Sequence, residues 1–180
     1  MVYIVVGIVA ALVLAFVVFV AFQSEDFSIS RSGSMAAPPA QVFPEVNDFH
    51  RWEAWSPWAK IDPAMKTTYT GPTSGEGASY AWSGNDKAGE GKMTITKSQP
   101  THQINIQLEF FRPFRATNMV EFTLSPKDQG TLVSWTMNGK KNFFLKALHL
   151  FMNMDKMVGP DFEKGLAQLK TVVESAPQPR

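Results

Sequence analysis

The side chains best suited to acid–base chemistry are three histidines and one acidic residue in a turn. His50, His102 and His149 are scattered along the chain, and Glu90 directly precedes Gly91. A general acid or base has to lie in a pocket that shifts its pKa towards the working pH. Scattered positions such as these are more typical of exposed or structural side chains. The sequence therefore identifies no catalytic residue, and an enzyme would need the fold to bring these groups together.

Motifs for metal, nucleophile or nucleotide chemistry are missing from the sequence. No two histidines have metal-ligand spacing, neither His-Glu-x-x-His nor Gly-x-Ser-x-Gly occurs, and the chain has no cysteine. Gly84 and Gly89 have the spacing of two P-loop glycines, but Glu90 stands where that motif needs lysine. We therefore expect no metal and no cofactor. A Ser/His/Asp set that is assembled only in space remains open.

Tryptophan is the most informative residue type in this chain. Trp52, Trp55 and Trp58 fall within seven positions, and Pro57 and Pro63 prevent one long helix there. Burying one such ring is worth at most ~4–6 kcal/mol, from its area and the transfer free energy per unit area. Three such rings are not expected to stay in water. They either fill a core or roof a hollow, and the function depends on which.

Length and charge narrow the class of protein. The chain has 180 residues, which indicates one domain with an appendage. Its formal net charge is +1, because lysine and arginine nearly balance aspartate and glutamate. This charge gives no electrostatic case for a nucleic-acid partner. The sequence does not indicate an oligomeric state.

The run from Val2 to Phe22 is uncharged throughout, which predicts a single-pass transmembrane anchor at residues 2–22. As a helix it spans roughly 30 Å, the thickness of the hydrocarbon core of a bilayer. A cleaved signal peptide fits less well, because no basic residue precedes the run and the bulky Phe19 lies close to its end. The positive-inside rule, which predicts the orientation of a span from nearby lysine and arginine, gives almost no signal here. The acidic residues that follow, Glu25 and Asp26, favour an extracytoplasmic domain.

We predict a connector at residues 23–26, a folded domain at 27–174 and a tail at 175–180. Alternation with a period of two predicts seven strands, at residues 27–35, 67–70, 78–83, 91–97, 103–111, 116–124 and 131–138. Short turns join most of them, so we expect an antiparallel meander with one polar face and one apolar face. The apolar face requires a cover.

Helices at both ends of the strand series are expected to supply this cover. A proline pair at residues 38–39 opens a short helix. The region 143–157 is strongly apolar, and apolar residues repeat at helical spacing through 162–173. Gly159 and Pro160 are expected to kink or divide this C-terminal element.

The order of elements resembles the helix-grip fold of the START-like (SRPBCC) superfamily, the polyketide cyclase/dehydrase and lipid-transport group. Three segments carry the resemblance: residues 36–43, the tryptophan-rich residues 47–58, and residues 153–169, which are similar to the closing helix of one bacterial subgroup. The resemblance implies an α+β fold in which a seven-stranded antiparallel sheet curls around a long C-terminal helix. The anchor is an addition that makes this a membrane-anchored member.

The resemblance also implies a pocket between the sheet and the long helix. The residues expected to line it are Trp55, Trp58, Tyr80, Trp82, Met93, Ile106, Leu108, Phe110, Asn118, Phe122, Trp135 and Met137. For each of them the competing interpretation is ordinary core packing. For Asn118 the competing interpretation is a hydrogen bond to the backbone, and the functional one is contact with a ligand head group. A dry, empty pocket of ~300 Å³ would cost about 7 kcal/mol. A real pocket must therefore hold ligand or water, or else large side chains close it.

Lys140, Lys141 and Lys146 flank an apolar run at residues 143–145. This mixture is compatible with lipid head groups around inserted rings. Solvated lysines at the start of a helix are the commoner interpretation.

The leading functional hypothesis is a membrane-anchored, non-catalytic binding domain for a hydrophobic small molecule, either a lipid or a polyketide-like compound. The first alternative is a cyclase- or dehydratase-like enzyme for an apolar substrate. It requires Glu90, Asn118 or His50 inside the hollow. The second alternative is a structural or interaction module whose cavity has collapsed.

Overall fold

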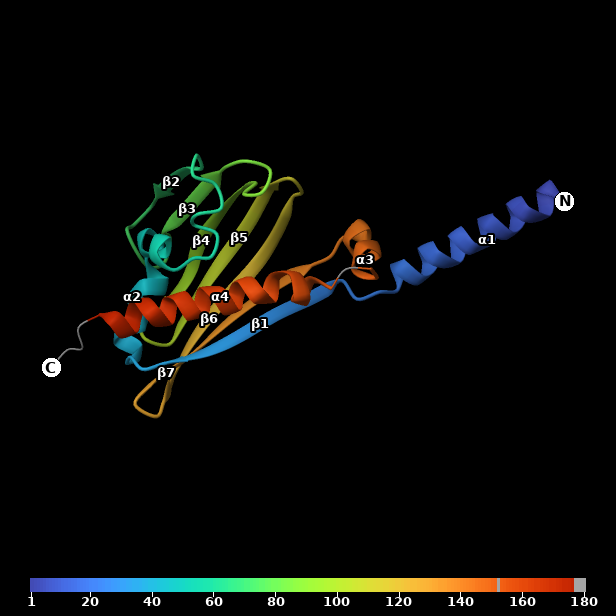
Figure 1. Ribbon diagram of the computed structural model, residues 1–180. Helices are drawn as coiled ribbons and strands as arrows, with labels where there is room; N and C mark the ends of the chain where they lie inside the picture. The colour runs from blue at the N-terminus through green and yellow to red at the C-terminus, as the bar shows by residue number, and fades with distance from the viewer. Residues whose placement is uncertain (152, 177–180) are drawn as a thin grey trace.

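A single helix projects from a sheet-and-helix domain in the computed structural model, which describes residues 1–151 and 153–176 (Figure 1). This helix, α1 (Val2–Ala21), leaves the domain at one end. The C-terminal end of the last helix lies at the opposite end. Of the predicted tail, residues 177–180 lie outside the described part.

One sheet of seven antiparallel strands forms the body of the domain, in the spatial order β1-β7-β6-β5-β4-β3-β2. The strands are β1 (Asp26–Met35), β2 (Lys66–Thr70), β3 (Ser79–Ser83), β4 (Glu90–Gln99), β5 (Gln103–Arg112), β6 (Ala116–Lys127) and β7 (Gly130–Lys140). This arrangement confirms the predicted meander. Along β6, Val120, Phe122 and Leu124 are buried, whereas Glu121 and Thr123 between them remain partly exposed. The sheet therefore has one apolar face and one wet face.

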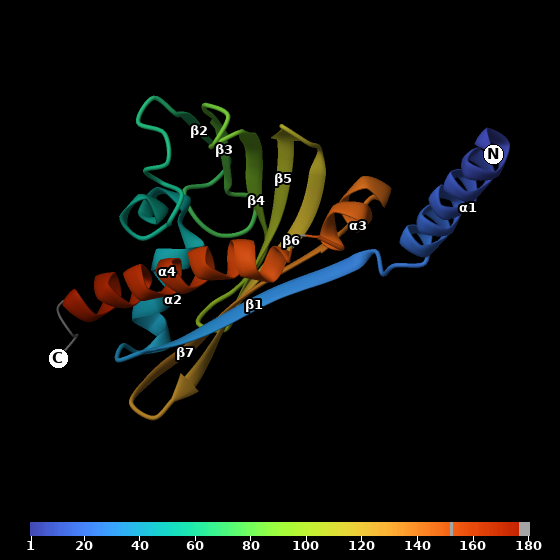
Figure 2. The same ribbon diagram turned by 45° about the vertical axis from the view of Figure 1, so that its right-hand side comes forward.

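The helices cover the apolar, concave face, which confirms the helix-grip prediction (Figures 1 and 2). They are α2 (Pro39–Asn47), the 3₁₀ turn η1 (Phe49–Ala54) and α4 (Met154–Ser175), whereas α3 (Phe143–His149) lies at the end of the domain beside α1. The expected division at Gly159 and Pro160 is wrong, because α4 runs through both residues. The chain is interrupted earlier, before α4, where the Asn153 side chain accepts a hydrogen bond from Lys156 N and caps the helix.

Arg31 on β1 fastens α4 to the sheet. Its guanidinium donates to both Asp155 carboxylate oxygens, at 2.8 and 2.9 Å, and to Glu163 Oε1 at 2.7 Å. A Cβ at position 159 would collide with this guanidinium, so Gly159 leaves the room that the contact needs. The hydrogen bonds from Arg31 lower the pKa of the Asp155 carboxyl.

We expect Arg31→Met to lower the melting temperature at pH 7 by a few degrees. Because the pKa of Asp155 is lowered in the folded state, this contact stabilises the fold fully above the unfolded-state pKa and is lost as the pH falls through the folded-state value. The difference from the wild type should therefore shrink as the pH is lowered from 7 to 3. Thermal melts followed by circular dichroism measure it, and a difference that stays constant over this range would contradict the prediction.

Candidate ligand-binding site

One half of the concave face is filled by aromatic rings, which we call the packed half: Trp52, Trp55, Phe122, Trp135 and Phe162. The rings of Trp135 and Phe162 stack with centroids 4.2 Å apart, and those of Trp52 and Trp55 are 4.7 Å apart. Trp55 and Phe122 are 0% exposed. Aromatic pairs at these distances add to the stability that comes from area burial. This half of the interior is core.

The backbone of α2 explains why the tryptophans point inward. The Trp52 indole N–H donates to Val46 O and the Trp55 indole N–H donates to Glu45 O, both at 3.0 Å. These two carbonyls lie in the last turn of α2, where carbonyls lack partners within the helix. Asp48 caps η1 by accepting from His50 N, which fixes the start of the tryptophan segment. Two of the three clustered tryptophans therefore serve the core.

A second set of side chains on the concave face stays half-buried, and we call it the apolar strip. It consists of Trp58, Tyr80, Trp82, Met93, Leu108 and Phe110, with Met154 and Val158 of α4. Tyr80 and Trp82 stack with centroids 6.0 Å apart, and Phe110 meets Trp82 edge-on at 5.9 Å. The rings of Tyr80, Trp82 and Phe110 thus form one aromatic surface, and Trp58 borders the packed half, where its ring lies 5.7 Å from Trp135 and 6.2 Å from Phe162.

Gly91 holds the Trp82 ring in the strip. Gly91 lies opposite Trp82 on β3 and opposite Phe110 on β5, and a Cβ there would lie 2.5 Å from two Trp82 ring carbons. The Trp82 indole N–H donates to Ala88 O at 3.0 Å. The ring therefore lies flat over a position that only glycine fits.

We expect Gly91→Ala to destabilise the domain by ~1–3 kcal/mol, the usual cost of forcing extra volume into a packed site. Urea unfolding measures this change, and acrylamide quenching of tryptophan fluorescence should rise as Trp82 is pushed outward. Gly33→Ala is the matched control, because its Cβ would meet Leu166 at an ordinary 3.5 Å. Equal effects of the two substitutions would contradict the role given to Gly91.

The twelve residues expected to line a pocket divide evenly between the two environments. Six lie in the apolar strip, and the other six are buried: Trp55, Ile106, Asn118, Phe122, Trp135 and Met137. Asn118 lies directly across from Leu108 of the strip and fills the space above Gly139, where a Cβ would collide with its amide oxygen. Asn118 thus places a buried polar side chain next to the strip. Ligand contact by any of the twelve remains a prediction.

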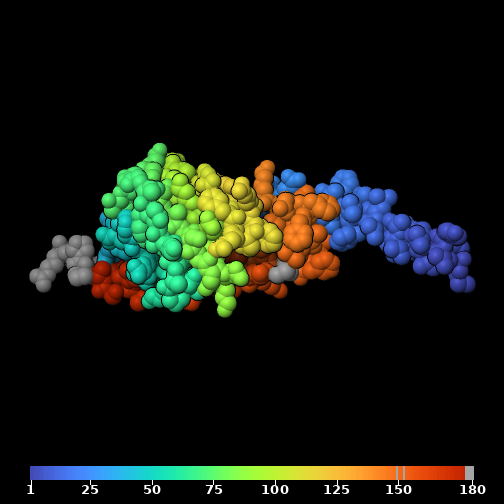
Figure 3. Space-filling view, turned by 90° about the horizontal axis from the view of Figure 1, so that it is seen from above, coloured from blue at the N-terminus to red at the C-terminus, as the bar shows by residue number. Residues whose placement is uncertain are grey.

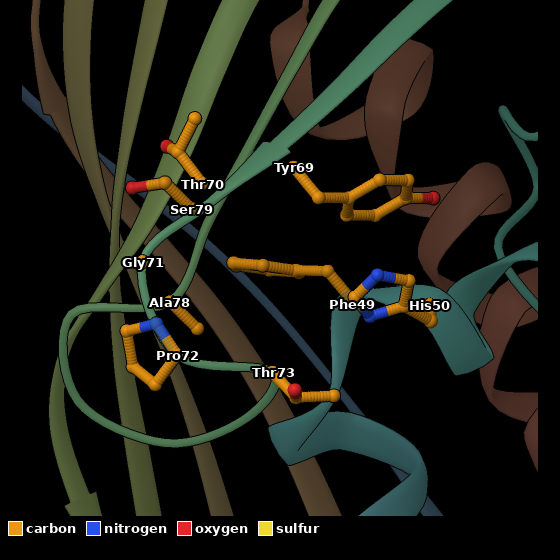
Figure 4. Close-up of a pocket in the computed structure, with 9 residues that line it drawn as sticks. All are labelled: Phe49, His50, Tyr69, Thr70, Gly71, Pro72, Thr73, Ala78 and Ser79. Carbon is orange, nitrogen blue, oxygen red and sulfur yellow. The ribbon is translucent and has the colours of Figure 1, made fainter.

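His50 lines a separate hollow of about 180 Å³ between η1 and the β2–β3 hairpin (Figure 4). The hollow is lined by Phe49, His50, Tyr69, Thr70, Gly71, Pro72, Thr73, Ala78 and Ser79. The imidazole stacks on Tyr69 with centroids 4.0 Å apart, and its Nδ1 is 2.8 Å from Asp48 Oδ1. Pockets for drug-sized ligands measure ~300–1,000 Å³, so this hollow accommodates only a small group.

The phenols beside this hollow are held in their neutral form. Burial raises the pKa of Tyr80 to about 12 and also raises the pKa of Tyr69. Both side chains are therefore hydrogen-bonding groups at neutral pH and not bases. No signal in the sequence indicated the stacking of His50 on Tyr69.

The residues considered for a catalytic role occupy separate places. His50 lines the hollow, Asn118 is buried on β6, and Glu90 is half-buried at the start of β4. His102 is exposed in the β4–β5 turn, with Nδ1 2.9 Å from Pro100 O. The side chain of His149 lies outside the described part. Within the described residues, no group of three His, Asp or Glu side chains could hold a metal ion.

An open trough of about 690 Å³ runs along the solvent face of β1, β7 and β6, and sequence analysis did not anticipate it. Its lining residues are Asp26, Phe27, Ser28, Thr117, Met119, Asn138, Gly139 and Lys140. The trough spans three strands, and alternation along single strands does not reveal such a feature.

The curled seven-stranded sheet, the long closing helix and the apolar concave face define a START-like helix-grip domain. The chain belongs to the family described as polyketide cyclase / dehydrase and lipid transport, which matches residues 26–174. No curated protein matches the sequence.

Solved structures share this fold at low sequence identity. CV1439 from Chromobacterium violaceum is 15% identical with a TM-score of 0.60, over 83% of this chain and 98% of that one. MLL2253 from Mesorhizobium loti is 14% identical with a TM-score of 0.62, over 84% and 99%. The Aha1 dimer from Colwellia psychrerythraea is 15% identical with a TM-score of 0.59, over 83% and 97%. These likenesses concern the fold alone.

Proposed function

We propose that this protein is a membrane-anchored, non-catalytic binding protein for a hydrophobic small molecule, such as a lipid or a polyketide-like compound. The observation that carries the proposal is the half-buried apolar strip. Apolar surface in contact with water costs ~25 cal/mol per Å², so an exposed strip inside the grip favours an apolar guest. Membership of a family described by cyclase, dehydrase and lipid-transport functions supports the same class of ligand.

The character of α1 supports the anchor. It is 20 residues long, apolar on every side, and buried only at Val20. A helix that exposes apolar side chains all round is typical of a membrane span. Its last turn is also bound by the domain, because Lys146 Nζ donates to Ala21 O at 3.3 Å. Removal of α1 as a signal peptide would leave this buried lysine without that acceptor, so we favour a retained anchor. The acidic flank, Glu25 and Asp26, favours an extracytoplasmic domain.

The polar groups near the strip support binding without catalysis. Burial raises the pKa of Tyr80 to about 12, and the Asn118 amide does not ionise, so neither side chain is a general base near neutral pH. The cyclase-type alternative would place its chemistry at His50 with Asp48 behind it. His50 lines the small hollow beside the strip, and Asp48 already has a structural role as the cap of η1.

The proposal is tested by photolabelling the full chain in lipid nanodiscs with a diazirine-bearing fatty acid, followed by peptide mapping. We expect label on peptides that contain Met93, Leu108 and Phe110, in addition to α1. Leu108→Trp fills the strip and should lower the label on these peptides about tenfold, equivalent to ~1.4 kcal/mol of binding. Labelling of α1 serves as the internal reference.

Gln107→Trp is the matched control, since it adds the same indole to the opposite face of β5 and should leave the label unchanged. A domain that stays unlabelled while α1 is labelled would overturn the binding proposal. Label confined to peptides around His50 and Tyr69 would favour the cyclase-type alternative instead.

A further inference from the structure

The end of the domain next to α1 exposes a cluster of large apolar side chains, which we call the end patch. Its members are Phe111 near the end of β5, Phe114 of the β5–β6 turn, Phe143 and Phe144 of α3, and Leu150 and Phe151 after α3. Phe114, Phe144 and Phe151 are 63%, 59% and 79% exposed. The rings of Phe114 and Phe144 lie 6.3 Å apart, so the two segments form one surface. Clustered apolar exposure of this kind marks an interaction surface.

The end patch is fixed beside the last turn of α1. Lys146 of α3 is 7% exposed, and its Nζ donates to Ala21 O at 3.3 Å and to Glu25 Oε1 at 3.0 Å. Lys141 N donates to Glu25 O at 2.7 Å, and Val20 is fully buried. The views in Figures 1 to 3 place α3 at the domain end of α1, and Figure 3 shows the β5–β6 region (yellow) against the α3 region (orange). The patch therefore lies at the level where α1 leaves the domain.

Basic side chains surround the end patch. Arg112 and Arg115 flank Phe114, and Lys140 and Lys141 precede α3. Arg112, Arg115 and Lys140 are exposed. The nearby Glu25 carboxylate is already paired with Lys146, which lowers its pKa. Apolar rings within a basic rim match a surface of acyl chains beneath anionic head groups.

We propose that the end patch docks on the lipid surface of the membrane that α1 spans, with Phe114 and Phe151 inserted at the boundary between head groups and acyl chains. This inference rests on the proposed anchor. A bilayer is the occupant that α1 itself supplies, because a helix that ends at the membrane surface brings α3, bound to its last turn, to the same surface.

Docking would also bring the apolar strip to the bilayer. The strip reaches the same end of the domain as the patch, because Phe110 lies two residues before the end of β5 and Met154 of the strip comes three residues after Phe151 of the patch. A hydrophobic molecule would then pass between the acyl chains and the strip without crossing open water. The patch deepens the proposed function by naming the membrane as the source of the ligand.

Spin labelling of the full chain tests this proposal, and the absence of native cysteine makes single labels unambiguous. Nitroxides at Phe114→Cys and Phe151→Cys are examined in liposomes of phosphatidylcholine and phosphatidylglycerol. We expect both labels to be accessible to oxygen and shielded from a water-soluble nickel complex. A label at Lys127→Cys, at the end of β6 far from α1, should be fully accessible to nickel, and one at Leu12→Cys in α1 should be shielded.

The outcomes separate the two proposals. If the two patch labels are as accessible to nickel as the Lys127 label while the Leu12 label is shielded, docking is overturned and the anchor stands. If the Leu12 label is accessible to nickel as well, both proposals fail. Spectral broadening of the patch labels that grows with protein density would show that a second copy covers the patch, and would also overturn docking.

Discussion

Replacing both Leu12 and Leu14 with arginine should abolish stable membrane association of the protein. The two residues lie near the middle of α1, where each arginine costs ~2.5–3.5 kcal/mol of insertion free energy. Fourteen Val, Ile, Leu and Phe side chains in α1 contribute ~0.3–0.6 kcal/mol each, so about 4–8 kcal/mol in total. Two arginines therefore cancel most or all of the driving force. Carbonate extraction of membranes should release the double variant, while the wild type stays in the pellet.

The double alanine variant at the same two positions is the matched control. It removes side-chain volume without adding charge, so it should remain in the membrane fraction. An intact mass that still includes residues 1–22 in that fraction would exclude cleavage of a signal peptide. Extraction of the wild type together with the arginine variant would contradict the anchor, whatever the fold of the domain.

The strands were predictable because their pattern is local. Along residues 103–111, Ile104 and Ile106 alternate with Asn105 and Gln107, and β5 forms there with the two isoleucines fully buried. Such a pattern specifies both the strand and the face that turns inward. The pattern therefore predicted the strands, their meander and the apolar face without knowledge of any long-range contact, and the curl of the sheet was implied by the family resemblance.

The C-terminal helices were predicted less well, because their boundary depends on caps within an apolar run. Asn142 and Asn153 each accept a backbone N–H hydrogen bond at the start of a helix. An apolar run that continues past the end of α3 hides this division. Gly159 was expected to kink or divide the C-terminal helix, but it instead leaves room for the Arg31 guanidinium.

Alternation could not predict which half of the concave face is packed. It assigns Trp135 and Trp82 equally to the inside, but Trp135 is covered by Phe162 of α4 and by η1, whereas Trp82 is not. Gly165 contributes to this difference, since a Cβ there would lie 2.7 Å from the Trp135 ring and 3.1 Å from Pro57. The position of α4 over the sheet therefore decides between core and candidate site, and no local pattern specifies it.

Contacts between distant segments account for most of what sequence reasoning missed. Arg31 and Asp155 are 124 residues apart, and Lys146 and Ala21 are 125 residues apart. Lys146 appeared to be one of three solvated lysines, yet the fold buries it and uses it to attach α1. The sequence around a charged residue beside an apolar run does not indicate which distant residue will be its partner in the folded protein.

The second prediction with a large expected effect concerns the stability of the packed half. We expect Trp55→Ala to lower the free energy of unfolding by ~3–5 kcal/mol, the range for truncating buried aromatic side chains. The ring is 0% exposed, packs against Trp52 and Phe122, and donates its N–H to Glu45 O. A domain of this size has ~5–15 kcal/mol of stability, so the variant should be marginal. Urea unfolding of the full chain in nanodiscs, followed by near-ultraviolet circular dichroism, measures the change.

Trp58→Ala is the control that separates core from strip. Trp58 is half-buried and belongs to the apolar strip, so its loss should cost clearly less than that of Trp55. Indole should stabilise Trp55→Ala by refilling the cavity, because apolar cavities of this kind bind aromatic molecules. At 100 times its dissociation constant the gain would be ~2.7 kcal/mol. Equal losses for Trp55 and Trp58 would contradict the division of the concave face into a packed half and a strip.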